Sequence, residues 1–266
     1  MIIKIKKLFS QIFEILSRPE MSLLPGQLAY FFVLALVPTI TIITFVASFI
    51  EVPLSELSVY YAIELPSNVF SLLEPIKINS GGVSYLIIFL VTMYISSNGM
   101  NSVIISANKM YGVKEYNFFK ARIKALFMVL IIVSLFVFIL VIPFFGSFIM
   151  QLLSKIIKYE FIFKIITLVR YPFLILIMYL FLKTIYILAP DKEIAPRSVN
   201  PGALLCSVGW VLSTYIYILY LTRFANYNRY YNSLGDVVAL MFLIYILAYI
   251  FVIGMAINYK KENLKE

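Results

Sequence analysis

Long uncharged stretches dominate the pattern of hydrophobic and polar positions along this chain. Five runs contain no charged residue, and each exceeds the roughly 20 apolar residues that a helix needs to cross a bilayer core. A sixth stretch, from Ile165 to Ala189, contains Arg170 and Lys183, each near one end, where long basic side chains can reach the interface. The pattern predicts an all-α polytopic integral membrane protein with six transmembrane helices, near residues 26–50, 83–106, 125–150, 167–189, 202–222 and 237–258.

The first residues follow a different, amphipathic pattern. On a helix, polar side chains would form one stripe, and Ile5, Leu8, Ile12 and Leu16 would lie away from it; the polar members are Lys4, Lys7, Gln11, Glu14 and Arg18. No small-residue cleavage site follows, so this stretch is not expected to be a signal peptide. We therefore expect an interfacial helix at residues 1–20, followed by one transmembrane domain at residues 21–266.

Composition excludes several classes of protein. Hydrophobic residues make up 62% of the chain and charged residues 13%, against roughly 45–50% and 25% in soluble domains. This composition excludes a soluble globular protein and a disordered chain, and the single cysteine, Cys206, excludes a disulfide scaffold. The chain contains no histidine, so it cannot build a Ser-His-Asp triad or a histidine zinc site. We expect no enzyme activity, no catalytic residue, no metal and no cofactor.

The net charge of +9 follows the predicted topology. With the N-terminus inside, about two thirds of the 22 lysines and arginines fall in cytoplasmic segments, which supports cytoplasmic N- and C-termini. The third connection, with Lys155, Lys158, Lys164 and Arg170, fits this bias least well. The positive charge therefore requires no nucleic-acid partner. Membrane lipids are the expected partners, and a homo-oligomer is an open alternative.

Polar residues inside the predicted spans are the candidates for function. Asn98, Asn101 and Asn108 share one helical face with Tyr94 in the second span. These asparagines either join helices by hydrogen bonds or line a polar path, because intramembrane polarity is costly and often functional. Tyr30 in the first span and Tyr217 in the fifth are further candidates for the path lining. Pro38 is either a structural kink or a mobile hinge.

A second candidate site lies at the outer ends of the fifth and sixth helices. Asp236 follows Gly235, and we expect it to open the last helix, where the helix dipole stabilises an acid. The alternative role for Asp236 is ion coupling, or pairing with a nearby arginine. We predict an outer mouth that binds an anionic headgroup, formed by Arg223, Tyr227, Arg229, Tyr231 and Asp236.

Several motifs resemble the YihY/BrkB family of bacterial inner-membrane proteins. The most specific runs from Tyr227 to Gly235 and is similar to the family's Y-N-x-x-Y-G-S-L-G. The first span is similar in Leu28-Ala29-Tyr30-Phe31 with Pro38, and the end of the second span in Asn101 to Glu115, where Asn108 matches a family asparagine. Other matching positions are Arg122, Pro201, Gly202, Trp210, Gly254 and Asn258. The resemblance implies a bacterial inner-membrane protein with six spans and with both termini on the cytoplasmic side.

Two positions depart from the family pattern. Asn232 stands where the family usually has glycine, and Ala256 stands where a glutamate is expected. If that acid carries a proton or cation in relatives, this chain lacks it.

Three functions from different classes follow. The favoured one is a permease that moves a lipid or another amphipathic envelope compound along a polar path between helices. The alternative is an envelope assembly or scaffold protein that transports nothing. A ribonuclease label is attached to the family, but the acids of this chain are dispersed, whereas metal-assisted hydrolysis needs clustered carboxylate or histidine ligands.

Overall fold

The regular elements that the structure describes are all helices. The computed structural model describes residues 23–35, 82–113, 117–134, 160–224 and 228–263, together with Ser10, Glu14 and Ser17. Helices occupy Leu23–Ala35, residues 118–134, α5 (Gly82–Tyr111), α7 (Glu160–Leu188), α8 (Asn200–Phe224) and α9 (Asn228–Asn263). The predicted all-α class is therefore confirmed for this part of the chain.

Local sequence signals explain where two helices end and begin. Gly112, with φ of 70°, follows α5 in the left-handed conformation that glycine adopts without steric cost. The N–H of Val113 donates to the Asn108 carbonyl at 2.9 Å, and the N–H of Gly112 donates to the Lys109 carbonyl at 3.4 Å, which is the Schellman pattern. The side chain of Asn117 then caps the next helix by accepting a 3.1 Å hydrogen bond from the Lys120 N–H.

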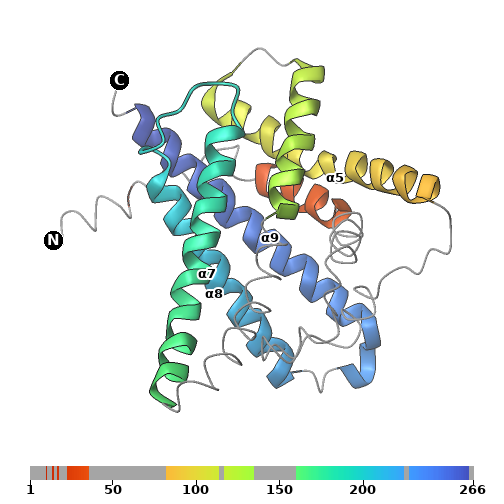
Figure 1. Ribbon diagram of the computed structural model, residues 1–266, viewed down its shortest axis with the longest axis vertical. Helices are drawn as coiled ribbons and strands as arrows, with labels where there is room; N and C mark the ends of the chain where they lie inside the picture. The colour runs from red at the N-terminus through yellow and green to blue at the C-terminus, as the bar shows by residue number, and fades with distance from the viewer. Residues whose placement is uncertain are drawn as a thin grey trace. The chain divides into compact units, whose positions relative to one another are not determined.

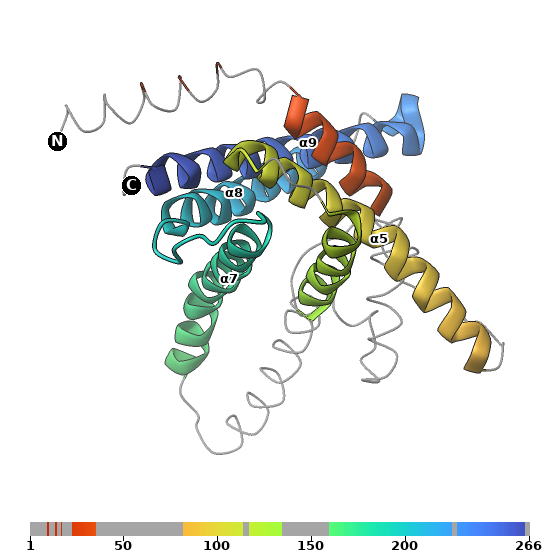
Figure 2. The ribbon, with the colours of Figure 1, turned by 90° about the horizontal axis from the view of Figure 1, so that it is seen from above.

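Two of the described helices are long and apolar enough to cross a membrane. They cover Asn200–Tyr220 in α8 and Val238–Asn263 in α9, in close agreement with the predicted spans at 202–222 and 237–258. Figures 1 and 2 both show α8 and α9 running alongside each other. Ile175–Leu188 in α7 and Leu23–Ala35 are shorter apolar helices.

The start of α9 corrects one prediction. We expected Asp236 to open the last helix, but α9 begins at Asn228, and no acid lies in its first turn. Asp236 is thus inside the helix, where its backbone N–H is no longer one of the free groups at a helix N-terminus. The helix-dipole argument for Asp236 is therefore wrong.

The chain divides into two compact units. Unit 1 contains Met1–Val33, Asn101–Ala121 and Pro172–Glu266, whereas unit 2 contains Leu34–Met100 and Arg122–Tyr171. The core of unit 1 includes fully buried apolar side chains from four helices, namely Leu28, Ile104, Leu182 and Phe251. In unit 2, the buried side chains include Met93, Ala125 and Met128.

The N-terminal helix is described at three positions. Ser10 and Glu14 are helical and exposed, and the Glu14 carboxylate accepts a 3.1 Å hydrogen bond within an ion pair with Lys260 on α9. An exposed pair of this kind contributes little to stability, typically less than about 1 kcal/mol. The other residues of the predicted interfacial helix lie outside the described part of the chain.

Candidate functional site

A close approach between α8 and α9 organises unit 1. The N–H of Gly202 donates a 2.8 Å hydrogen bond to the side-chain oxygen of Asn258, which is fully buried. A Cβ atom at Gly202 would overlap the Gly254 carbonyl and the Asn258 side chain, and one at Gly254 would lie 2.9 Å from the Gly202 carbonyl oxygen. The two glycines therefore let the helix backbones come close enough for the Asn258 side chain to bind the first turn of α8.

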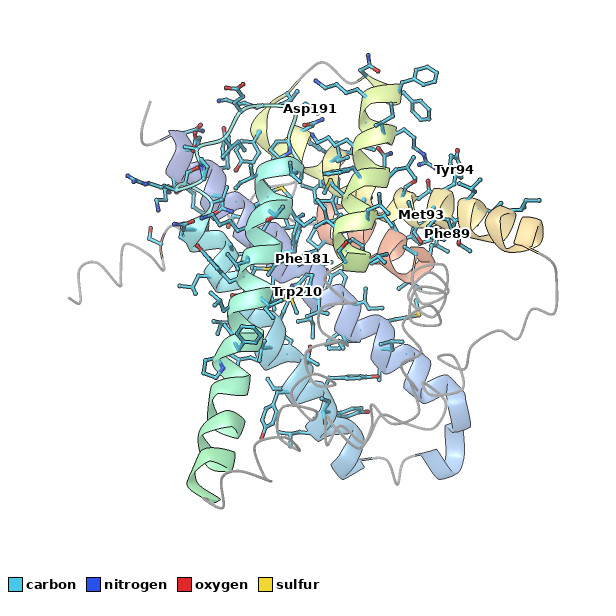
Figure 3. All side chains as sticks on the ribbon, viewed as in Figure 1. Phe89, Met93, Tyr94, Phe181, Asp191 and Trp210 are labelled. Carbon is cyan, nitrogen blue, oxygen red and sulfur yellow. The ribbon has the colours of Figure 1, made fainter. Side chains whose placement is uncertain are left out.

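Aromatic side chains extend this contact along α9. The Tyr186 hydroxyl on α7 donates to the Phe251 carbonyl at 2.8 Å, and the two rings stack with centroids 4.7 Å apart. Trp210 on α8, labelled in Figure 3, donates its indole N–H to the Leu247 carbonyl at 3.0 Å. The hydroxyl of Tyr186 and the indole N–H of Trp210 thus each have a backbone partner on α9, and the two side chains connect α7 and α8 to that helix.

Asn108 connects α5 to the segment between α7 and α8. Its side-chain NH₂ donates to the Asp191 carboxylate at 2.7 Å, and its side-chain oxygen accepts from the Asp191 backbone N–H, also at 2.7 Å. Asp191 is labelled in Figure 3. Both polar ends of this buried amide therefore have a hydrogen-bond partner, as is usual for buried polar groups.

At the end of α5 and where α8 approaches α9, four side chains each have a buried polar atom with no hydrogen-bond partner among the described residues. They are the Tyr111 hydroxyl, the Asn200 side-chain oxygen, the Asn258 side-chain nitrogen and one carboxylate oxygen of Glu262. We call these residues of α5, α8 and α9 the polar cluster.

Further contacts bring the members of the polar cluster together. Tyr111 packs edge-on against Tyr259 with ring centroids 5.4 Å apart, and Asn200 lies two residues before Gly202, to which Asn258 is bonded. Asn258 and Glu262 are one helical turn apart on α9. Burial, and secondly the negative charge of Glu262, raise the pKa of the Tyr111 phenol well above its usual value near 10.

A separate polar arrangement lies in unit 2 around Arg122. The guanidinium donates to the Asn98 side-chain oxygen at 2.7 Å and to the Tyr94 carbonyl at 3.0 Å. It also lies over the Tyr94 ring, 3.8 Å from the centroid. Asn98 therefore binds a cation from the following helix, a partner that the spacing of the asparagines did not reveal.

The predicted path residues are described individually. Asn98, Asn101 and Asn108 all lie on α5, the first in unit 2 and the other two in unit 1. Tyr30 and Tyr94 are exposed, and Tyr217 is half-buried on α8. For Asn98 and Asn108, the hydrogen bonds support the helix-joining alternative; a path lining by any of these residues stays a prediction.

The predicted outer mouth and hinge cannot be compared with side-chain positions. The side chains of Arg223, Arg229, Tyr231 and Asp236, and all of Tyr227 and Pro38, lie outside what the structure describes. Within the described residues, no three His, Cys, Asp or Glu side chains lie together as a metal site would require. The expectation that the protein uses no metal or cofactor stays a prediction.

The sequence contained signals for part of this site. Gly202, Gly254 and Asn258 all appear in the motifs that resemble the family, and they converge in space. Asp191 and Glu262 are two of the dispersed acids, and their sequence context does not mark them as members of a site. No sequence pattern joins Asp191 to Asn108, because the two residues are 83 positions apart.

Comparisons with known proteins agree with the motifs. The sequence profile of the family described as virulence factor BrkB matches residues 12–266. The chain is also 30% identical over 254 residues to a protein of Bacillus subtilis (strain 168) named ribonuclease-like protein YfkH, and the match covers 91% of each chain. No solved structure matches the chain. The profile match over almost the whole length, with the apolar helices α8 and α9, shows that this chain belongs to the BrkB family and is a helical membrane protein.

Proposed function

We propose that this protein is a permease of the bacterial inner membrane that moves a lipid or another amphipathic envelope compound along a polar path between its helices. The observation that supports this proposal most is the polar cluster, in which three helices contribute buried polar atoms that have no hydrogen-bond partner in the described part of the chain. The proposal includes six spans, cytoplasmic termini and no enzymatic step.

Energetic cost is the reason that the polar cluster favours transport. Leaving a buried donor or acceptor unsatisfied costs about 1–3 kcal/mol, and the polar cluster contains four such atoms. A protein that only holds other components together gains nothing from that cost. Water or the polar headgroup of a passing molecule would satisfy the donor of Asn258, the acceptors of Asn200 and Glu262, and the hydroxyl of Tyr111.

The scaffold alternative has one observation in its favour. Asn98 and Asn108 both have hydrogen-bond partners in other segments, as expected if intramembrane asparagines stabilise a helix assembly. This alternative explains those two asparagines but leaves the unsatisfied atoms of the polar cluster without a role.

A ribonuclease is not proposed. The Bacillus subtilis relative has a ribonuclease-like name at 30% identity, but this chain contains no histidine. Metal-assisted cleavage of a phosphodiester needs carboxylate or imidazole ligands gathered around the ion. We likewise propose no nucleic-acid partner.

Reconstitution into liposomes tests the proposal. Vesicles that contain the purified protein and a fluorescent phospholipid are treated with dithionite, which bleaches the label in the outer leaflet only. We expect the protein to expose the inner-leaflet label to bleaching. A parallel ion-flux assay distinguishes lipid movement from a general leak.

Matched variants connect the activity to the polar cluster. Glu262→Gln and Tyr111→Phe keep the side-chain shapes but change or remove a polar atom, and we expect their combination to slow lipid movement about tenfold or more. Glu193→Gln removes an exposed acid of the same charge and serves as the control. Vesicles in which the folded parent protein moves neither lipid nor ions would overturn the permease proposal and favour the scaffold.

A further inference from the structure

Arg122 is a cation without an acidic partner in the part of the chain that the structure describes. Its interactions there are with the Asn98 side-chain oxygen, the Tyr94 carbonyl and the Tyr94 ring, all of which are neutral. The Nε–H group is buried and has no hydrogen-bond partner among the residues that the structure describes. A guanidinium has five N–H donors, and two hydrogen bonds leave most of them unused.

The partners of Arg122 hold the guanidinium in a fixed orientation. Two hydrogen bonds, of 2.7 and 3.0 Å, set the direction of its plane, and the Tyr94 ring supports one face at 3.8 Å. A planar fork that is fixed in this way matches the paired oxygens of a phosphate group. Because none of its partners in the described segments carries a negative charge, the positive charge of Arg122 is available to an anionic ligand.

Exposed apolar side chains lie on both helices beside this cation. On α5, Ile87, Leu90 and Tyr94 follow one another at helical spacing, and Tyr94 is 56% exposed. On the helix at residues 118–134, Ile123 and Phe127 are 69% and 59% exposed. Acyl chains would cover such stripes, whereas a water-soluble anion would leave them bare.

We propose that Arg122, Asn98 and Tyr94 form a binding site for the phosphate headgroup of an anionic phospholipid, whose acyl chains lie along the exposed stripes of the two helices. Charge complementarity and the apolar surroundings together select a lipid over a free anion. The inference rests on the proposed function, for which it names the substrate class as anionic phospholipids.

Direct binding tests this site without depending on transport. The full-length protein in detergent is titrated with dioleoyl-phosphatidylglycerol or dioleoyl-phosphatidylcholine, and the retained lipid is counted by native mass spectrometry. We expect the parent protein to bind phosphatidylglycerol more tightly. Arg122→Gln should weaken this binding about tenfold or more, because a charge-assisted pair is lost. Lys120→Gln, which removes an exposed charge at the start of the same helix, should change the binding less than about twofold.

Two further variants separate a binding role from a folding role. Arg122→Lys keeps the charge but loses the planar fork, and Tyr94→Leu removes the supporting ring but keeps the backbone carbonyl. Both should weaken phosphatidylglycerol binding while circular dichroism and the melting temperature show a folded protein. They also provide the test if Arg122→Gln does not fold.

Three results would overturn the inference. The first is unchanged phosphatidylglycerol binding by folded Arg122 variants, and the second is equal binding of the two lipids by the parent protein. The third is displacement of the lipid by millimolar inorganic phosphate, which would indicate a site for a soluble anion. If binding behaves as expected but liposomes show no lipid movement, the permease proposal fails and the lipid site stands.

Discussion

Asn108 and Asp191 form two reciprocal hydrogen bonds, each 2.7 Å long, between the end of α5 and the segment that joins α7 to α8. One bond has a charged acceptor, and the other uses a backbone N–H that no helix satisfies. The pair therefore holds a connecting segment to a helix that lies far away in sequence, and it does so with a single buried side chain.

Replacing Asn108 should destabilise the fold more than neutralising Asp191. Asn108→Leu loses both hydrogen bonds, so we expect the free energy of unfolding to fall by about 2–4 kcal/mol. Asp191→Asn keeps a neutral acceptor and the backbone bond, so its loss should be smaller. Thermal unfolding in detergent measures both, and equal melting temperatures for Asn108→Leu and the parent would contradict the assignment.

The approach of α8 to α9 should not tolerate a methyl group. Gly254→Ala would bring a Cβ atom against the Tyr186 hydroxyl and the Gly202 carbonyl, and we expect a loss of about 1–3 kcal/mol from overpacking. Gly26→Ala is the matched control, because an added Cβ there meets no atom within 4 Å. Within a helix, that change should cost nothing and stabilise by up to about 1 kcal/mol. Similar melting temperatures for the two variants would show that the close approach is wrong.

Asn98 provides a test between joining helices and lining a path. If its main role is to bind Arg122, Asn98→Leu should lower stability by about 0.6–1.7 kcal/mol, the range for interhelical hydrogen bonds in membranes. If it lines a path, the variant should lose lipid movement in liposomes while the melting temperature hardly changes. The hydrogen bond to Arg122 leads us to expect the loss of stability. Asn101→Leu, measured in parallel, tests the same choice in unit 1.

Tyr111 should make the protein more sensitive to alkaline pH. Burial and the nearby Glu262 charge raise the pKa of its phenol in the folded protein. The unfolded chain releases this proton near pH 10, whereas the folded protein retains it to higher pH. The free energy of unfolding is therefore unaffected by this group below pH 10 and falls as the pH rises above it. Tyr111→Phe should therefore lose less stability than the parent between about pH 9.5 and 11. Parallel curves of melting temperature against pH for the two proteins would refute the burial of the phenol.

Reporter fusions test the predicted topology. A reporter after Glu266 should be cytoplasmic, and one inserted near Asn68 should be external, because the positive-inside bias predicts that both termini lie inside. An external C-terminus would mean an odd number of spans. The predicted span that would then be given up is Ile165–Ala189, because it contains Arg170 and Lys183.

The amino-acid sequence by itself determined the helical class and the positions of α8 and α9. A long uncharged run can satisfy its own backbone groups within a membrane by forming a helix, so hydropathy locates the apolar segments of α8 and α9 to within a few residues, although not the start of α9 at Asn228. The short motifs around Asn108, Gly202, Gly254 and Asn258 also identified the family, because family membership depends on local residue identity.

Tertiary structure alone decided which polar groups meet. Helical periodicity placed Asn98 and Asn108 on one face, but the packing bonds Asn98 to Arg122 and Asn108 to Asp191. The start of α9 at Asn228 likewise moved Asp236 from a helix end to a helix interior. Periodicity describes how side chains are arranged around one helix. The partner of a buried polar group depends on which other helix desolvates it, and that depends on the packing of segments far apart in the chain.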